Sequence, residues 1–166
     1  MPSKGDPQVV IRRAETRDLA VLGRLGALMV NLHHGYDKDR FMVPADDVAE
    51  GYAWFLGTDL GQEEVLVLVA ELAGAVVGYV YAGLEPQSWK ELREPAGFIH
   101  DLVVEDSARR RGIASQLLES ASAWLEAHGA PRVLLWTAQK NAAAQRLFEH
   151  LGFRRTMIEM TREKRS

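Results

Sequence analysis

The chain of 166 residues contains no cysteine. Without thiols there is no disulfide framework, no cysteine nucleophile and no thiolate metal site, and cysteine usage does not indicate a compartment. An excess of one charge is also missing, because 20 Lys and Arg residues are set against 23 Asp and Glu residues, for a net charge of −3. This slightly acidic balance argues against a general nucleic-acid binder.

Long hydrophobic runs are absent as well. No apolar stretch is long enough to cross a membrane, and the short polar leader Met1–Pro7 has no apolar core of the kind that signal peptides carry. With 47% hydrophobic and 26% charged residues, the chain has the composition of a globular protein. We therefore expect a single domain over residues 1–166 with a mobile leader over residues 1–7, no membrane partner and, by default, a cytoplasmic location.

The common nucleotide-binding loops are missing too, since no Gly-Lys-Ser/Thr and no G-x-G-x-x-G occurs. What the sequence does contain is a strand–turn–helix pattern. The apolar run Phe98–Val104, interrupted only by His100 and Asp101, predicts a strand. A polar turn follows at residues 105–107, and residues 109–114 then open a helix whose apolar positions have helical spacing.

The start of that helix is suited to an anion. Its first N–H groups have no partner within the helix, and the helix dipole adds partial positive charge there. Gly112 and Ala114 keep the turn small, so a phosphate can approach the backbone. Arg109, Arg110 and Arg111 add guanidinium groups. A basic, solvated helix start, or a patch for acidic partners, is the alternative, but three positive charges beside the dipole are unfavourable unless an anion offsets them.

The pattern Arg109-x-x-Gly112-x-Ala114 resembles the pyrophosphate loop of the GNAT family of N-acetyltransferases, which reads Gln/Arg-x-x-Gly-x-Gly/Ala after a strand. A second segment, which begins at Asn141 and reads N-x-x-A-x-x-L-F-x-x-x-G-F, is similar to a second family motif at the usual distance. The close resemblance covers residues 98–155. The first half of the chain matches only in the order of its elements.

Hydrophobic periodicity and turn residues predict the other elements. The predicted strands span residues 8–13, 65–71, 75–83, 98–104, 132–137 and 153–161, and the predicted helices span residues 17–32, 45–60, 109–128 and 141–151. The short turn after residue 71 predicts an antiparallel hairpin, and strand–helix–strand over residues 98–137 predicts a parallel pair. The sequence thus predicts an α/β fold with a mixed, mostly antiparallel sheet and helices on both faces. The resemblance implies that the parallel pair splays apart, so that a pantetheine arm binds like an added strand.

The resemblance further implies acetyl-CoA as co-substrate and no metal. The backbone of residues 110–114 would hold the pyrophosphate, and Asn141 would contact the pantetheine arm or order the loop around it. Asn141 is equally suited to cap the following helix. The implied coenzyme contacts are Leu102, Val103, Val104, Arg109, Arg110, Arg111, Gly112, Ile113, Ala114, Ser115, Asn141, Ala144 and Phe148.

The implied reaction is direct attack of a primary amine on the thioester. It needs a base to take the ammonium proton and a backbone N–H to stabilise the oxyanion. The candidate bases are His100 and Asp101, because similar enzymes acting on arylalkylamines or aminoglycosides carry a His or an Asp at the corresponding position. Strand alternation predicts that the two point to opposite faces, and each could instead be a hydrogen-bonded structural group.

Phe148 departs from the family pattern, since many members have a tyrosine there whose hydroxyl protonates the departing thiolate. Solvent, Tyr79 or Tyr81 would do that work, or the thiolate leaves unassisted. The favoured function is an acetyl-CoA-dependent N-acetyltransferase for a small-molecule or protein amine. A non-catalytic acyl-CoA-binding or sensing module is the alternative.

Two further expectations concern the loops and the C-terminus. The residues of the stretch His33–Pro44 match no zinc spacing, so a solvated loop or substrate lid is expected there rather than a metal site. Acidic loop residues such as Asp37 and Glu85 would suit a cationic acceptor or simply face solvent. The apolar residues of the last predicted strand, together with the resemblance, lead us to expect a homodimer through sheet edges.

Overall fold

The computed structural model describes residues 7–166, so the predicted leader lies outside the described residues except for Pro7. The elements in chain order are β1 (Val9–Arg13), η1 (Thr16–Asp18), α1 (Leu19–Tyr36), α2 (Val48–Asp59), β2 (Val65–Leu72), β3 (Ala75–Glu85), β4 (Ala96–Val104), η2 (Asp106–Ala108), α3 (Ile113–Ala127), β5 (Val133–Leu135) and α4 (Ala142–His150).

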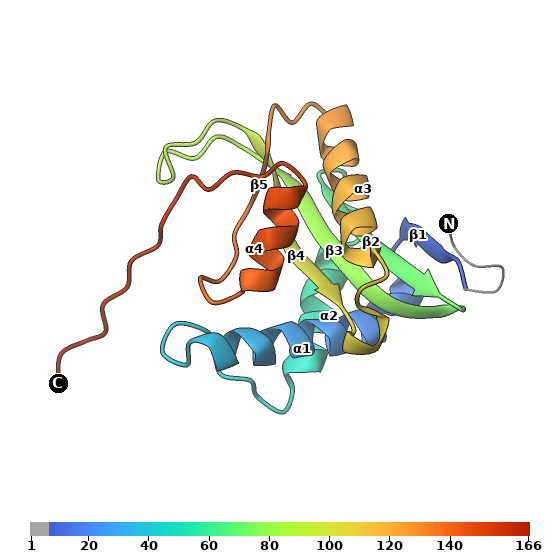
Figure 1. Cartoon of the computed structure of the whole chain (residues 1–166), viewed down its shortest axis with the longest axis horizontal. Helices are drawn as coiled ribbons and strands as arrows, with labels where there is room; N and C mark the ends of the chain where they lie inside the picture. The colour runs from blue at the N-terminus through green and yellow to red at the C-terminus, as the bar shows by residue number, and fades with distance from the viewer. Residues whose placement is uncertain (1–6) are drawn as a thin grey trace.

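The strands form one mixed sheet in the order β1-β2-β3-β4-β5. Neighbours from β1 to β4 are antiparallel, and β4 pairs with β5 in parallel. Figure 1 shows α3 and α4 on one side of the sheet and α1 and α2 on the other. The predicted α/β class, the mixed and mostly antiparallel sheet and the coverage of both faces are confirmed.

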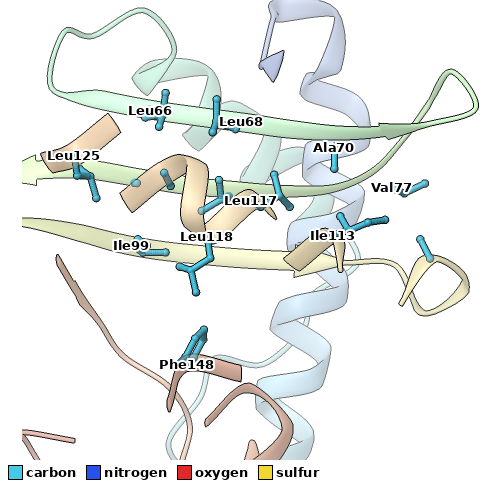
Figure 2. Packing of buried hydrophobic residues seen from close by; sticks show 14 residues of the cluster. Leu66, Leu68, Ala70, Val77, Ile99, Ile113, Leu117, Leu118, Leu125 and Phe148 are labelled. Atoms are coloured by element: carbon cyan, nitrogen blue, oxygen red, sulfur yellow. The ribbon is translucent and has the colours of Figure 1, made fainter. Parts of the chain in front are cut away.

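Two hydrophobic clusters hold the helices against the sheet. In the larger cluster, leucines of α3 lie against β2, β3 and β4 (Figure 2). The smaller cluster lies beneath α1 and α2 and contains Leu22, Leu25, Leu56, Val67, Val69, Tyr79 and Val103. Each fully buried leucine stabilises the fold by roughly 1.5–3 kcal/mol. Because β2 is covered on both faces, its sequence is a continuous apolar run rather than an alternating one.

Helices α1 and α2 approach closely because α1 has glycine where they meet. A Cβ added at Gly26 would lie 2.3 Å from the ring of Tyr52 on α2. The absence of that carbon allows the tyrosine ring to pass between the helices and reach the sheet. This contact positions one of the side chains described below.

The parallel strands part after a short pairing. β4 and β5 pair only through residues 97–99 and 133–135. β4 then continues to Val104 with no partner on its β5 side among residues 7–166. This is the splayed pair that the resemblance implied, and it leaves backbone N–H and C=O groups of β4 open to a ligand.

A β-bulge interrupts β4 at the same point. Tyr81 pairs with Asp101, whereas the next residue, Ala82, pairs with Ile99, so His100 is the extra residue on β4. The bulge breaks the alternation of side chains. The His100 ring lies 5.0 Å from the Tyr81 ring, and Asp101 is hydrogen-bonded to a tyrosine of α2, so both face the α1/α2 side of the sheet. The prediction that they point to opposite faces is wrong.

The predicted last strand is also wrong for the single chain. Residues 153–161 have no strand pairing, and Figure 1 shows this segment leaving α4 and running out past the body of the domain. The side chains of Met157, Ile158 and Met160 are 80–86% exposed. Strand propensity is not sufficient, because an extended segment also needs a sheet edge to which it can hydrogen-bond.

Candidate active site

The turn between β4 and α3 has the backbone conformation of an anion site. Arg110 and Gly112 adopt left-handed conformations, with φ of 60° and 72°. Such a conformation turns neighbouring N–H groups toward a common concavity. A Cβ at Gly112 would meet no atom within 4 Å, so the space above it is open. The sequence had predicted that the three arginines open the helix. In the structure α3 begins at Ile113, so the arginines lie before it.

A cavity of about 240 Å³ lies over this turn. Its lining includes the predicted coenzyme contacts Val104, Arg109, Arg110, Gly112, Ile113, Ala114 and Ser115. Ala108 and Leu147 complete the lining and were not predicted. The other predicted contacts, Leu102, Val103, Arg111, Asn141, Ala144 and Phe148, do not line it. Val103 lies in the cluster beneath α1 and α2, so its side chain faces away.

The charge at the turn is only partly neutralised. Arg109 forms an ion pair of 3.0 Å with Asp106, and both side chains are exposed. Such surface pairs contribute up to about 1 kcal/mol and are readily exchanged. Within residues 7–166, neither Arg110 nor Arg111 forms an ion pair. Their guanidinium groups are therefore available to an anion such as a pyrophosphate.

Helix α4 closes the far side of the cavity. The Asn141 side chain accepts a hydrogen bond of 3.2 Å from the Ala144 N–H and so caps the helix. Phe148 is buried in the core beside Phe153, and Leu147 lines the cavity in its place. Asn141 therefore has a structural role as the cap of α4.

Asp101 is a buried carboxyl group held by two phenols. It is 7% exposed and accepts hydrogen bonds from the hydroxyls of Tyr52 and Tyr79, the latter at 3.0 Å. Burial raises the pKa of Asp101, although the two hydrogen bonds oppose this rise. Burial, together with the Asp101 charge, raises the pKa of each tyrosine well above its ordinary value. A carboxyl with a raised pKa is a stronger base than an ordinary one.

The buried carboxyl makes stability depend on pH in a defined direction. Asp101 holds its proton more tightly in the folded protein than in the unfolded chain. The free energy of unfolding contributed by this group should therefore decrease as pH rises from about 4, where an ordinary carboxyl titrates, through the raised pKa of Asp101. Asp101→Asn should remove this decrease, which urea unfolding of both proteins across that range measures. A difference between the two proteins that is constant with pH would contradict this prediction.

His100 lies beside Asp101 in the chain but in a different environment. Its side chain is 31% exposed, and its Nε2 lies 3.0 Å from Oε1 of Glu85. Its ring stacks on Phe98 at 4.8 Å with an interplanar angle of 12°. A carboxylate partner and a stacked ring fix the orientation of an imidazole. The bulge thus places an oriented histidine and a buried aspartate on one side of the sheet, where β4 and β5 part.

Tyr79 and Tyr81 are the proton donors that the sequence predicts as replacements for the tyrosine missing at Phe148. Both hydroxyls already donate hydrogen bonds to carboxylates. Tyr79 donates to Asp101, and Tyr81 donates to Asp59 on α2.

Within the part of the chain that the structure describes, no group of three or more His, Asp or Glu side chains is placed to hold a metal ion. No helix there is both long and apolar enough to span a bilayer.

Comparison with known proteins identifies the family. Residues 29–153 match the acetyltransferase (GNAT) family. The chain belongs to this family. One curated relative, the mycothiol acetyltransferase of Thermobispora bispora, is 30% identical over 92 residues, which are 55% of this chain and 31% of that protein. The N-alpha-acetyltransferase of Sulfurisphaera tokodaii is 29% identical over 116 residues, 66% of this chain and 69% of that protein. The chain thus spans about a third of the first GNAT relative and about two thirds of the second.

The fold also matches solved structures. The aminoglycoside N-acetyltransferase AAC(6')-Iy in complex with CoA superposes with a TM-score of 0.74 at 20% identity, over 100% of both chains. At this identity the likeness establishes a shared GNAT fold and nothing finer.

The sequence did not predict that α2 contributes side chains to this candidate site. Tyr52, Phe55 and Asp59 reach the same side of the sheet as His100 and Asp101. Phe55 is 40% exposed, so part of its ring faces solvent. The available signal was the spacing of the three residues, which are three and four positions apart and so lie on one helix face.

Proposed function

We propose that this GNAT protein transfers the acetyl group of acetyl-CoA to a primary amine by direct attack of the amine on the thioester. The observation that carries the proposal is the left-handed turn at Arg110 and Gly112, which lies under a cavity at the end of the unpaired part of β4. The pyrophosphate would bind to the turn, and the pantetheine arm would run along the open edge of β4. That some relatives are named acetyltransferases, and that one fold neighbour is a CoA complex, agrees with this proposal.

In the proposed reaction, His100 takes a proton from the acceptor ammonium while Glu85 orients the imidazole. The amine nitrogen then attacks the thioester carbon, the N–C bond forms, and a backbone N–H of β4 donates to the oxyanion. The C–S bond breaks and releases the CoA thiolate, and the nitrogen gives its second proton to solvent as it becomes an amide. Since Phe148 has no hydroxyl, solvent protonates the thiolate, which is a good leaving group. Asp101, with its raised pKa, is the alternative base.

The test is release of CoA thiol from acetyl-CoA in the presence of a panel of primary amines. We expect thiol release that depends on the amine and a matching amount of N-acetylated product. The rival function, a non-catalytic acyl-CoA-binding module, is favoured by the missing hydroxyl at Phe148. Acetyl-CoA binding in calorimetry without turnover of any amine would support that rival. Absence of binding would contradict both functions.

We further propose that the protein forms a homodimer in which residues 153–161 of one copy add to a sheet edge of the other. Exposed apolar residues at the end of this segment support the proposal, as does the outer edge of β5, which has no partner strand within residues 7–166. Light scattering at tens of micromolar should give the mass of a dimer. Deletion of residues 156–166 should give a monomer, and a full-length chain with a monomeric mass would contradict the proposal.

A further inference from the structure

A continuous row of aromatic rings crosses the α1/α2 side of the sheet at the candidate base. The row passes from α2 over β3 and β4 to the end of β5 through Tyr52, Phe55, Tyr81, His100, Phe98 and Trp136. Successive ring centroids are 4.8–5.8 Å apart, which is the range of direct ring contact. The rings come from α2, β3 and β4, with Trp136 directly after β5, and these elements are labelled in Figure 1.

The row is open at the places where a ligand would need access. Phe55 is 40% exposed at one side, Trp136 is 71% exposed at the other, and the His100 side chain is 31% exposed between them. Phe98, by contrast, is 6% exposed, and its ring stacks against one face of the His100 ring. Exposed Phe and Trp side chains on a rigid helix and sheet present apolar area to water. A flat apolar group that covers them buries this area, which lowers the free energy.

The charge beside the row is negative. Asp59, Glu85 and Asp101 contact Tyr81, His100 and Tyr52 of the row, respectively, through a hydrogen bond or ion pair. Each carboxylate thus already has a partner on the row, and the exposed surface between them is formed by aromatic rings. This arrangement attracts a single ammonium group through ring faces and nearby carboxylates. It offers no set of free carboxylates for a ligand with several charges.

We infer that the acceptor is a primary amine attached to an aromatic or similarly flat apolar group, which lies along the row between Phe55 and Trp136 with its nitrogen at His100. The inference depends on the proposed acetyl transfer, because the amine must approach the thioester where β4 and β5 part. An aromatic body attached to that nitrogen then covers the exposed rings. Polyamines and aminoglycosides, which carry several separated charges, would leave the rings uncovered.

The test compares amines with the full-length protein and acetyl-CoA. We expect kcat/KM for 2-phenylethylamine to exceed that for spermidine by at least about tenfold, a ratio that one aromatic contact of this size can supply. A short peptide with N-terminal phenylalanine carries the same kind of aromatic amine. Its turnover, compared with that of 2-phenylethylamine, shows whether the acceptor is a peptide or a small molecule. Turnover that favours spermidine would overturn the inference and leave acetyl transfer intact. No turnover of any amine would instead remove the proposed function and this inference with it.

Variants of the two exposed ends locate the binding surface. Phe55→Ala and Trp136→Ala should each raise KM for 2-phenylethylamine about fivefold to tenfold without changing acetyl-CoA affinity, and Trp136→Phe should restore most of the loss. Trp54→Ala is the matched control, because Trp54 is 73% exposed on the same helix but outside the row, and Trp89→Ala is a second. Calorimetric binding of 2-phenylethylamine to the CoA-loaded variants gives the same comparison without catalysis. Equal effects of row and control variants would overturn the inference.

Discussion

Gly112→Asp should weaken acetyl-CoA binding by at least about 100-fold, equivalent to roughly 2.7 kcal/mol of binding free energy. Gly112 has a φ of 72°, and its missing side chain leaves open space at the turn. An aspartate tolerates this left-handed conformation better than most residues, so the fold should persist. Its carboxylate would, however, occupy the space proposed for the pyrophosphate and repel it. Calorimetry with acetyl-CoA measures the loss.

Two controls separate the causes of that loss. Gly112→Asn has the same size and shape without the charge, so it should lose about tenfold, which is the share due to bulk alone. Gly74→Asp introduces the same residue at a φ of 80° in the β2–β3 turn, also into open space, and should leave binding unchanged. Unchanged affinity in Gly112→Asp would exclude the turn as the pyrophosphate site.

His100→Ala should lower kcat by about 100-fold or more, within the range of 10²–10⁴ that a positioned base supplies. Acetyl-CoA affinity should hardly change, because His100 does not line the cavity over the turn. Since the His100 side chain is partly exposed, added imidazole should enter the space and restore part of the activity. Steady-state kinetics with and without imidazole measure both effects, and rescue is not expected of a purely structural histidine.

Asp101→Asn is the comparison that assigns the base. The amide can still accept hydrogen bonds from Tyr52 and Tyr79, so the buried contacts are largely retained. If Asp101→Asn abolishes turnover while His100→Ala does not, the base is Asp101. If both variants keep full activity, water or the free-base fraction of the amine carries the proton and both side chains are structural.

The sequence alone determined the fold class and the position of the turn that we propose as the anion site. Both depend on local signals: apolar periodicity defines strands and helices, and small residues after a strand define a turn with open amides. The α/β class and the two-sided sheet are confirmed, and seven of the predicted coenzyme contacts line the cavity over the turn. Gly112, Ala114, Arg109 and Arg110 could be placed at the cavity because each lies within a few residues of the others.

Only the tertiary structure decided which side chains meet at the site. The bulge at His100 arises from the pairing register between β3 and β4. The local sequence of β4 does not predict which residue will be the extra one. It turned His100 and Asp101 to the same side, against the simple alternation of a strand. Tyr52 reaches Asp101 because Gly26 of α1 leaves room for its ring, a contact between two helices.

The segment after α4 shows the same limit. Its apolar and β-branched residues favour an extended conformation, but a strand exists only where another edge supplies hydrogen bonds. The row of rings from Phe55 to Trp136 likewise joins residues 81 positions apart in the chain, and only the folded sheet brings them into one surface. The sequence thus determined most of the elements and the turn after β4, whereas contacts between distant elements decided which side chains share the proposed acceptor side.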